Sequence, residues 1–282
     1  MRSVRLTTAL ALAVAPALAA AQPPAAPDSA PPPIEDNSFL VEEAYNQERG
    51  VVQHINTFSR ATTGNGWLYT FTQEWPVPTQ LNQLSYTIPI ARPEGRGASP
   101  RFGDLLLNYR YQALAHEDLL FAPRLSAILP TGSASAGTGL GGAGVQVNLP
   151  LTAVLAPSLV SHSNVGGTLV PRGKTSDGER LRSANLTLGQ SFIWLARPRF
   201  NVMLESLFSH TSNRVTPRGA GDAVTLSNEA LTLSPGVRYA FNFRSGLQIV
   251  PGAAVPVTFS GGDADTGVFL YLSFEHPFAR TR

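Results

Sequence analysis

Hydrophobic and polar positions alternate along the chain from residue 50 to residue 278, in short segments that each end at a turn. The last segment carries its apolar residues on one face, at Val268, Leu270, Leu272, Phe274 and Phe278. Successive side chains of a β-strand point to opposite faces, so such a segment has one apolar and one polar side. The pattern predicts an all-β chain that forms a transmembrane up-and-down antiparallel β-barrel of about 12 strands, with about 10 or 14 as alternatives.

The candidate strands are each close to the length that a tilted strand needs to cross a membrane. We place them at Val51–Ser59, Trp67–Pro76, Leu81–Ile90, Gly103–Tyr111, Leu119–Leu129, Gly139–Leu149, Leu155–Ser163, Ser183–Leu195, Phe200–Ser212, Ala230–Phe241, Leu247–Phe259 and Gly267–Phe278. Short connections alternate with longer polar ones at residues 91–102, 130–138, 164–182 and 213–229. Outer-membrane barrels have short periplasmic turns and longer outer loops, so this asymmetry orients the predicted barrel.

Charged residues on the polar faces are expected to line the lumen. An Arg or Lys that faces lipid costs about 2–4 kcal/mol at the midplane, which favours the inward placement. The lumen-lining candidates are Glu74, Asp104, Arg110, Arg124, Glu205, Arg238 and Glu275. Two interpretations stay open: ion pairs that fill and brace a narrow barrel, and a path for a substrate.

Two predicted strands contain a Pro-Gly pair, Pro235-Gly236 and Pro251-Gly252. Proline cannot donate to a strand ladder and is normally found at edges and bulges. These pairs therefore indicate bulges or kinks in the wall, and such kinks could open a lateral gap toward lipid. An unbroken ladder across both prolines would exclude the gap.

The N-terminus has the features of a secretory signal peptide over residues 1–21, with Arg2 and Arg5 before a short apolar core and a cleavage site of small residues. That core is too short to span a membrane as a helix. Residues 22–37 are rich in Pro and Ala, which predicts an extended, disordered linker. An exported chain with these strands is expected in the cell outer membrane.

Residues 38–49 follow the linker and admit two predictions. Asp36, Asn37 or Ser38 could cap a short helix over residues 39–48, with Glu42 and Glu43 in favourable early positions. The alternative is a plug across the periplasmic mouth of the barrel. The barrel itself is predicted over residues 50–278, followed by a C-terminal tail of residues 279–282.

Composition excludes several classes of function. The chain has no cysteine, so its stability has to come from a core or from a closed sheet. Lys and Arg number 21 against 19 Asp and Glu, and loss of Arg2 and Arg5 with the signal would balance them. We find no basic patch with interleaved aromatics, so no nucleic-acid partner is expected. No metal-ligand cluster or phosphate-binding loop is apparent, and no cofactor is predicted.

Five segments carry a resemblance to a known family. They are residues 36–48 (DNSFLVEEAYNQE), 50–55 (GVVQHI), 103–111 (GDLLLNYRY), 247–252 (LQIVPG) and 269–278 (FLYLSFEHPF). Together they resemble the MetA-pathway-of-phenol-degradation family of outer-membrane transporter-like proteins. The resemblance implies an outer-membrane barrel and uptake of small hydrophobic or aromatic compounds, and it transfers no catalytic or ligand residue.

The last strand also resembles the assembly signal of outer-membrane proteins, which ends in an aromatic residue, here Phe278. This resemblance implies the barrel assembly machinery as a partner, together with the lipid and lipopolysaccharide of the outer membrane. A passive uptake channel is therefore the first functional hypothesis, and a structural barrel without transport is the second.

An enzyme is the third hypothesis. The segment His210-Thr211-Ser212-Asn213 resembles the His-x-Ser-Asn core of outer-membrane lipid acyl hydrolases. A spacing of two places His210 and Ser212 on one face of a strand, where the imidazole could accept the hydroxyl proton. The orienting group and the oxyanion site are not apparent, although Asn228 or Glu229 could approach. The chain is accordingly predicted not to be an enzyme.

Overall fold

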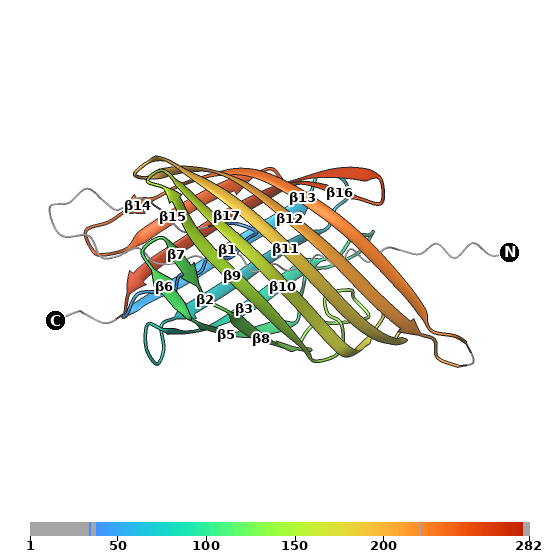
Figure 1. Ribbon diagram of the computed structural model, residues 1–282. Helices are drawn as coiled ribbons and strands as arrows, with labels where there is room; N and C mark the ends of the chain where they lie inside the picture. The colour runs from blue at the N-terminus through green and yellow to red at the C-terminus, as the bar shows by residue number, and fades with distance from the viewer. Residues whose placement is uncertain (1–33, 35–37, 220, 279–282) are drawn as a thin grey trace.

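The computed structural model describes Ile34 and residues 38–219 and 221–278. The predicted signal peptide, all but Ile34 of the predicted linker, and the C-terminal tail lie outside the described residues. Within them, one antiparallel sheet closes on itself, because the first strand pairs with both the second and the last. Figure 1 shows the strands winding obliquely around the barrel axis. Among the described residues, no helix is long and apolar enough to cross a membrane.

The barrel has twelve strands, four of which are interrupted. The uninterrupted ones are β1 (Val51–Ala61), β2 (Trp67–Trp75), β3 (Asn82–Arg92), β9 (Gly144–Ala156), β10 (Leu159–Lys174), β11 (Arg180–Arg197), β12 (Phe200–Thr216) and β17 (Asp263–Pro277). The interrupted ones are β4–β5–β6 (Arg101–Phe102, Leu105–Tyr111, Leu114–His116), β7–β8 (Leu119–Phe121, Arg124–Leu129), β13–β14 (Val224–Tyr239, Phe241–Asn242) and β15–β16 (Gln248–Ala254, Val257–Ser260). The predicted fold class and the strand number are confirmed.

The two faces of the wall differ as the alternation predicts. On β17, Val268 and Leu270 are exposed on the outside, whereas Phe269, Tyr271 and Glu275 are buried inside. The outer face along the other strands is also largely apolar, as a surface in contact with lipid tails requires.

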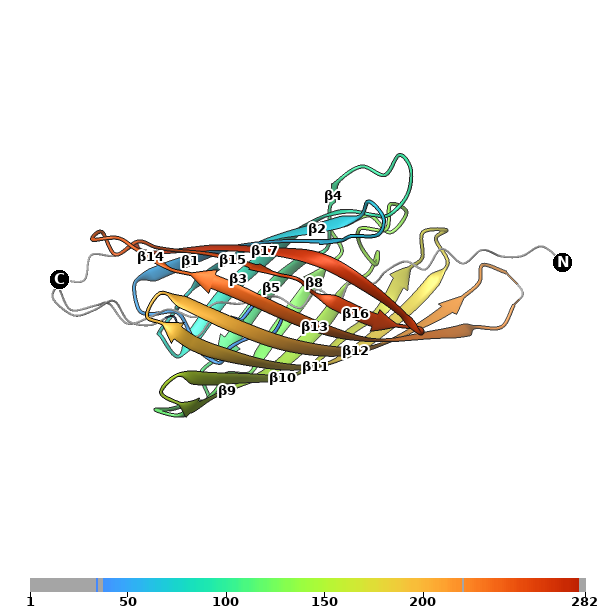
Figure 2. The same cartoon turned by 90° about the horizontal axis from the view of Figure 1, so that it is seen from above.

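The two ends of the barrel are built differently. At one end, the terminal end, the amide of Phe278 donates to the carbonyl of Gly50 at 2.8 Å. At the opposite end, the loop end, lie the connections 62–66, 93–100, 130–143, 175–179, 217–223 and 261–262. Figure 2 shows the loops before β4 and after β12 at this same end.

Two of the long predicted connections are mostly strand. β10 continues to Lys174 and β11 begins at Arg180, so the loop predicted at residues 164–182 shrinks to 175–179. β12 and β13 likewise reduce the loop predicted at residues 213–229 to 217–223. The prediction was wrong because polar residues were assigned to loops, whereas here they continue the strands of long hairpins (Figure 1).

The segment predicted as one strand over residues 155–163 contains a turn. Leu155 lies near the end of β9, and β10 begins at Leu159. Pro157 cannot donate to the ladder, and it starts the two-residue turn that separates the two strands.

The predicted bulges and lateral gap at the Pro-Gly pairs are wrong. β13 pairs with β15 and with β16 in one register, and the amide of Val255 donates to the carbonyl of Pro235 at 3.0 Å. Pro251 lies opposite Leu272 in a continuous β15–β17 pairing. Each proline therefore removes one hydrogen-bond donor from the ladder without changing the register of the strands, and the wall stays closed.

Candidate functional site

A short segment before the first strand lies inside the barrel and forms the candidate site. Residues 38–48, which we call the strap, contain no helix, and most of their side chains are buried. The helix predicted at residues 39–48 is therefore wrong. Ile34, assigned by sequence to the linker, is also buried, and its carbonyl accepts a hydrogen bond from Arg238 at 3.2 Å.

The first part of the strap is held by one carboxylate on β12. Oε1 of Glu205 accepts the amides of Phe39, Leu40 and Val41 at 3.1, 2.8 and 3.0 Å. Ser38 donates from its hydroxyl to Ser191 of β11 at 2.7 Å. Glu205 thus satisfies three backbone donors that an extended, buried segment would otherwise leave unpaired.

The middle of the strap crosses β10 and β9. The amide of Glu42 donates to Oδ1 of Asn164, and Nδ2 of Asn164 donates back to the Glu42 carbonyl, both at 2.7 Å. The amide of Ala44 donates to the hydroxyl of Thr152 at 2.9 Å. These side chains form hydrogen bonds with the backbone of the strap, as a neighbouring strand would in a sheet.

Two buried ion pairs fix the strap to β8 and β5. Nε of Arg124 donates to the two carboxylate oxygens of Glu42 at 2.9 and 3.0 Å, and all but about 2 % of each side chain is buried. Nη1 of Arg110 lies 3.4 Å from Oε1 of Glu43. A buried charge is costly unless it is paired, so each arginine of the wall stabilises a glutamate of the strap.

The end of the strap meets β3 and the start of β1. The amide of Gln47 donates to Oε1 of Gln83 at 2.7 Å, and its side chain donates to Gln53. Nε2 of Gln83 in turn donates to Glu74 at 2.7 Å. The strap therefore follows the inner wall from β12 round to β1.

An aromatic slot receives the side chain of Phe39. Its ring stacks on Phe269 and packs tilted against Tyr271, with ring centroids 5.5 and 5.1 Å apart. Gly236 and Gly252 form the floor, and a Cβ on Gly252 would lie 2.4 Å from the Phe39 ring. Around the slot, inward apolar residues form a cluster that includes Ile34, Ile55, Val160, Ile193, Met203, Val250 and Ala254.

The seven predicted lumen residues fall into three groups. Arg110, Arg124, Glu205 and Arg238 contact the strap or Ile34. Glu74 and Glu275 are buried on the inner face. Asp104 instead lies at the loop end, where it accepts the amides of Gly132 and Leu140 at 2.9 and 2.8 Å.

Several residues of the site were missed in the sequence. Asn164, Thr152 and Gln83 lie on inward faces, but nothing in the chain indicates that residues far away in sequence use them as backbone partners. Phe39 was treated as part of a helix, and its glycine floor was interpreted as a kink.

The candidate catalytic pair lies apart from the strap, on the outer face near the loop end. Nδ1 of His210 lies 3.1 Å from Oε1 of Glu229, which pairs with it across β12 and β13. Ser212 shares this face, but within the described part of the chain no hydrogen bond joins it to His210. Another histidine, His162, lies on the opposite face of the wall, where it is buried in the lumen and hydrogen-bonded to Thr152 at 2.7 Å.

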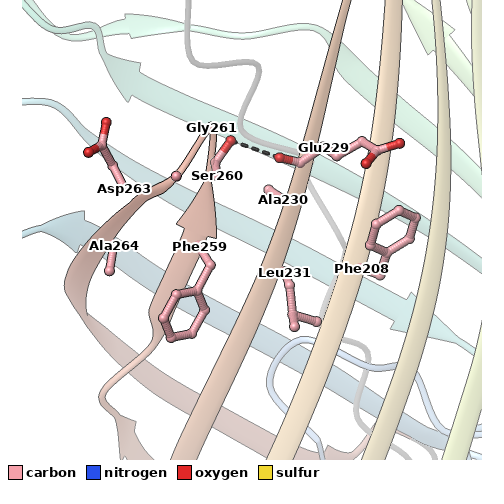
Figure 3. A pocket seen from close by; sticks show the side chains of 10 residues that line it. Phe208, Glu229, Ala230, Leu231, Phe259, Ser260, Gly261, Asp263 and Ala264 are labelled. Atoms are coloured by element: carbon pink, nitrogen blue, oxygen red, sulfur yellow. Dashed lines mark hydrogen bonds between the residues drawn. The ribbon is translucent and has the colours of Figure 1, made fainter.

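A shallow groove borders this pair. It encloses about 520 Å³ and is lined by Phe208, Glu229, Ala230, Leu231, Phe259, Ser260, Gly261, Gly262, Asp263 and Ala264. Figure 3 shows the apolar side chains of Phe208, Leu231 and Phe259 along it, with the Ser260 hydroxyl donating to the Glu229 carbonyl. The lining of the groove is mixed, with Glu229, Ser260 and Asp263 beside these apolar side chains.

The chain has the fold of an outer-membrane β-barrel. It resembles the crystal structure of the COG4313 outer membrane channel from Pseudomonas putida F1, with a TM-score of 0.67 and 12% identity, over 83% of this chain and 97% of that chain. The NanC and KdgM porins match more weakly, with TM-scores of 0.48 and 0.47 at 9% identity, over 79% and 81% of this chain and 98% and 99% of those chains. No family model matches the sequence. No curated protein matches it either.

Proposed function

We propose that this chain is an outer-membrane channel for passive uptake of small hydrophobic or aromatic compounds, and that the strap closes it. The Phe39 slot carries the proposal. The slot accommodates a six-membered ring, with aromatic walls and a floor without side chains, and the chain fills it with a phenyl group of its own. A small aromatic solute has the same shape and surface, so it competes with Phe39 for the slot.

The surroundings of the slot support this class of solute. Porin lumens are polar, yet the inner wall here has an apolar sector around Phe39. Burying a phenyl side chain from water contributes about 2–3 kcal/mol, so an aromatic solute gains free energy there while a sugar or an ion does not. Displacement of the strap is the step that would open the path.

Disulfide locking of the strap tests the proposal. The hydroxyls of Ser38 and Ser191 are 2.7 Å apart, and the chain has no cysteine of its own. Ser38→Cys with Ser191→Cys can therefore form a single disulfide between strap and wall. In liposomes carrying the refolded protein, we expect flux of benzene or phenol when the pair is reduced and at least a tenfold lower flux when it is oxidised.

The controls use the same preparation. Each single cysteine variant should conduct equally under both conditions, and glucose should not be taken up selectively. Equal flux of aromatic and polar solutes would overturn the solute class. No flux from the wild type or from the reduced pair would favour the second hypothesis, a structural barrel without transport.

A second candidate function rests on the outer face. Nδ1 of His210 lies 3.1 Å from Glu229, which lines the groove on the outer face, and Ser212 shares the face of His210. This arrangement favours a lipid acyl hydrolase in which Glu229 orients the imidazole and Ser212 is the nucleophile. Its test is release of fatty acid from lipid A or phospholipid by the wild type and by Ser212→Ala. No release by the wild type excludes the hydrolase without affecting the channel.

The location and the assembly partners belong to the same proposal. The apolar outer face supports a location in the outer membrane, and the short connections at the terminal end support a periplasmic position for that end. Phe278 is exposed beside the last strand, where the barrel assembly machinery would bind it. Two measurements check the location. The protein should fractionate with outer membranes, and it should resist heat unfolding in detergent gels.

A further inference from the structure

A group of cations lies on the outer face of the long hairpins. Arg172 and Lys174 of β10, Arg180 and Arg182 of β11, and Arg214 of β12 are all exposed. We call these five residues the basic cluster. The pairing places Lys174 opposite Arg180 and Arg182 opposite Arg214, while Gly173 and Leu181 between them are buried on the inner side.

Like charges in direct cross-strand positions destabilise a sheet. Within the described residues, none of the five cations forms an ion pair with a carboxylate, including Asp177 and Glu179 of the adjoining turn. The fold therefore carries two repulsive pairs that the protein itself does not neutralise, and an anion bound between the strands would relieve both.

The height of the cluster in the membrane identifies the anion. On the outer face of β11, Trp194, Phe192, Leu188 and Leu186 are exposed, and Arg182 follows on the same face toward the loop end. Arg182 is twelve residues from Trp194, which at about 3.3 Å per residue and a tilt of about 40° is about 30 Å along the axis. The apolar band of such barrels is about 25 Å tall, so Arg182 lies at the headgroups of the outer leaflet.

We infer that the basic cluster binds the phosphate groups of a phosphorylated glycolipid in the outer leaflet, whose acyl chains lie along the apolar wall below it. Arginine recognises phosphate through paired N–H donors, and several arginines at one height match a headgroup with more than one phosphate. The inference depends on the outer-membrane location only, and not on the solute or on any hydrolysis.

Binding of lipid A to the refolded full-length protein in detergent tests the inference, by native mass spectrometry and by the shift in thermal unfolding. The probes are bis-phosphorylated lipid A, dephosphorylated lipid A and inorganic phosphate. The test variant is Arg182→Gln with Arg214→Gln. The matched control is Arg197→Gln with Arg199→Gln, which removes two exposed arginines at the terminal end.

We expect the test variant to bind bis-phosphorylated lipid A at least tenfold more weakly than the wild type, and the control to be unchanged. Without lipid, the test variant should unfold at a higher temperature, because the repulsion is gone; this also shows that it folds. Equal binding of phosphorylated and dephosphorylated lipid A, or equal losses in both variants, would overturn the inference. If inorganic phosphate binds as tightly as lipid A, the ligand of the basic cluster is a free anion and the inferred lipid is wrong.

Discussion

Arg124 of the barrel wall and Glu42 of the strap form a buried ion pair, in which Nε lies 2.9 and 3.0 Å from the two carboxylate oxygens and Nη2 lies 2.5 Å from Oε1. The pair joins a segment outside the sheet to the sheet itself. Loss of this ion pair should therefore weaken the attachment of the strap more than it weakens the barrel.

Glu42→Gln should release the strap. Removing one partner of a buried pair costs about 3–5 kcal/mol, because the remaining charge is uncompensated. We expect open-channel current across planar bilayers to rise while the barrel keeps its heat resistance in detergent gels. Glu42→Gln with Arg124→Gln should recover part of the closed state, since no unpaired charge remains. Equal currents from the single and double variants would contradict this reasoning.

Gly252→Ala should expel Phe39 from its slot. The added Cβ would lie 2.4 Å from one ring carbon of Phe39 and 2.7 Å from another. We expect higher aromatic flux, and no further increase when Phe39→Ala is added, because both changes disrupt one contact. Gly167→Ala is the matched control, since its Cβ would meet nothing closer than 3.5 Å. Additive effects of Gly252→Ala and Phe39→Ala would argue against a shared contact.

Attachment of the strap should weaken as pH rises. Burial raises the pKa of Glu48 to about 7. The folded value lies above the unfolded one, so the contribution is fully present below the unfolded pKa and is lost as pH rises through about 7. The protection factors of the amides of residues 46–48, which correct hydrogen exchange for its intrinsic pH dependence, should be lower at pH 8 than at pH 5. Glu48→Gln should abolish the difference, and an unchanged difference would assign it to another group.

The loops formed by residues 62–66 and 93–100 should separate from each other in acid. Glu94 accepts the amides of Asn65 and Gly66 at 2.8 and 2.7 Å, and these bonds lower its pKa. A depressed pKa gives stability that is present above the unfolded value and is lost as pH falls through the folded value. The protection factors of both amides should fall in acid below the ordinary glutamate pKa, and in Glu94→Gln they should be low at all pH values. Strong protection in Glu94→Gln would show that the carboxylate is not needed.

The structure of the barrel wall could be predicted from the sequence, whereas the structure of the strap could not. Alternation at Val268 and Leu270 predicts a strand and its outer face, because that information is local. The fate of residues 38–48 depends on Glu205, Asn164 and Arg124, which lie more than 80 positions away. A capping serine and early glutamates favour a helix locally, but these long-range bonds satisfy the backbone donors without one.

The strap bonds to side chains on β12, β11, β10, β9, β8, β5, β3 and β1. It acts as an internal hoop that ties opposite sides of the wall together. Such a hoop fixes the outline of the barrel in cross-section, so the wall becomes more compliant when the strap leaves. If the strap closes the lumen as proposed, the same segment also sets the stiffness of the barrel that surrounds it.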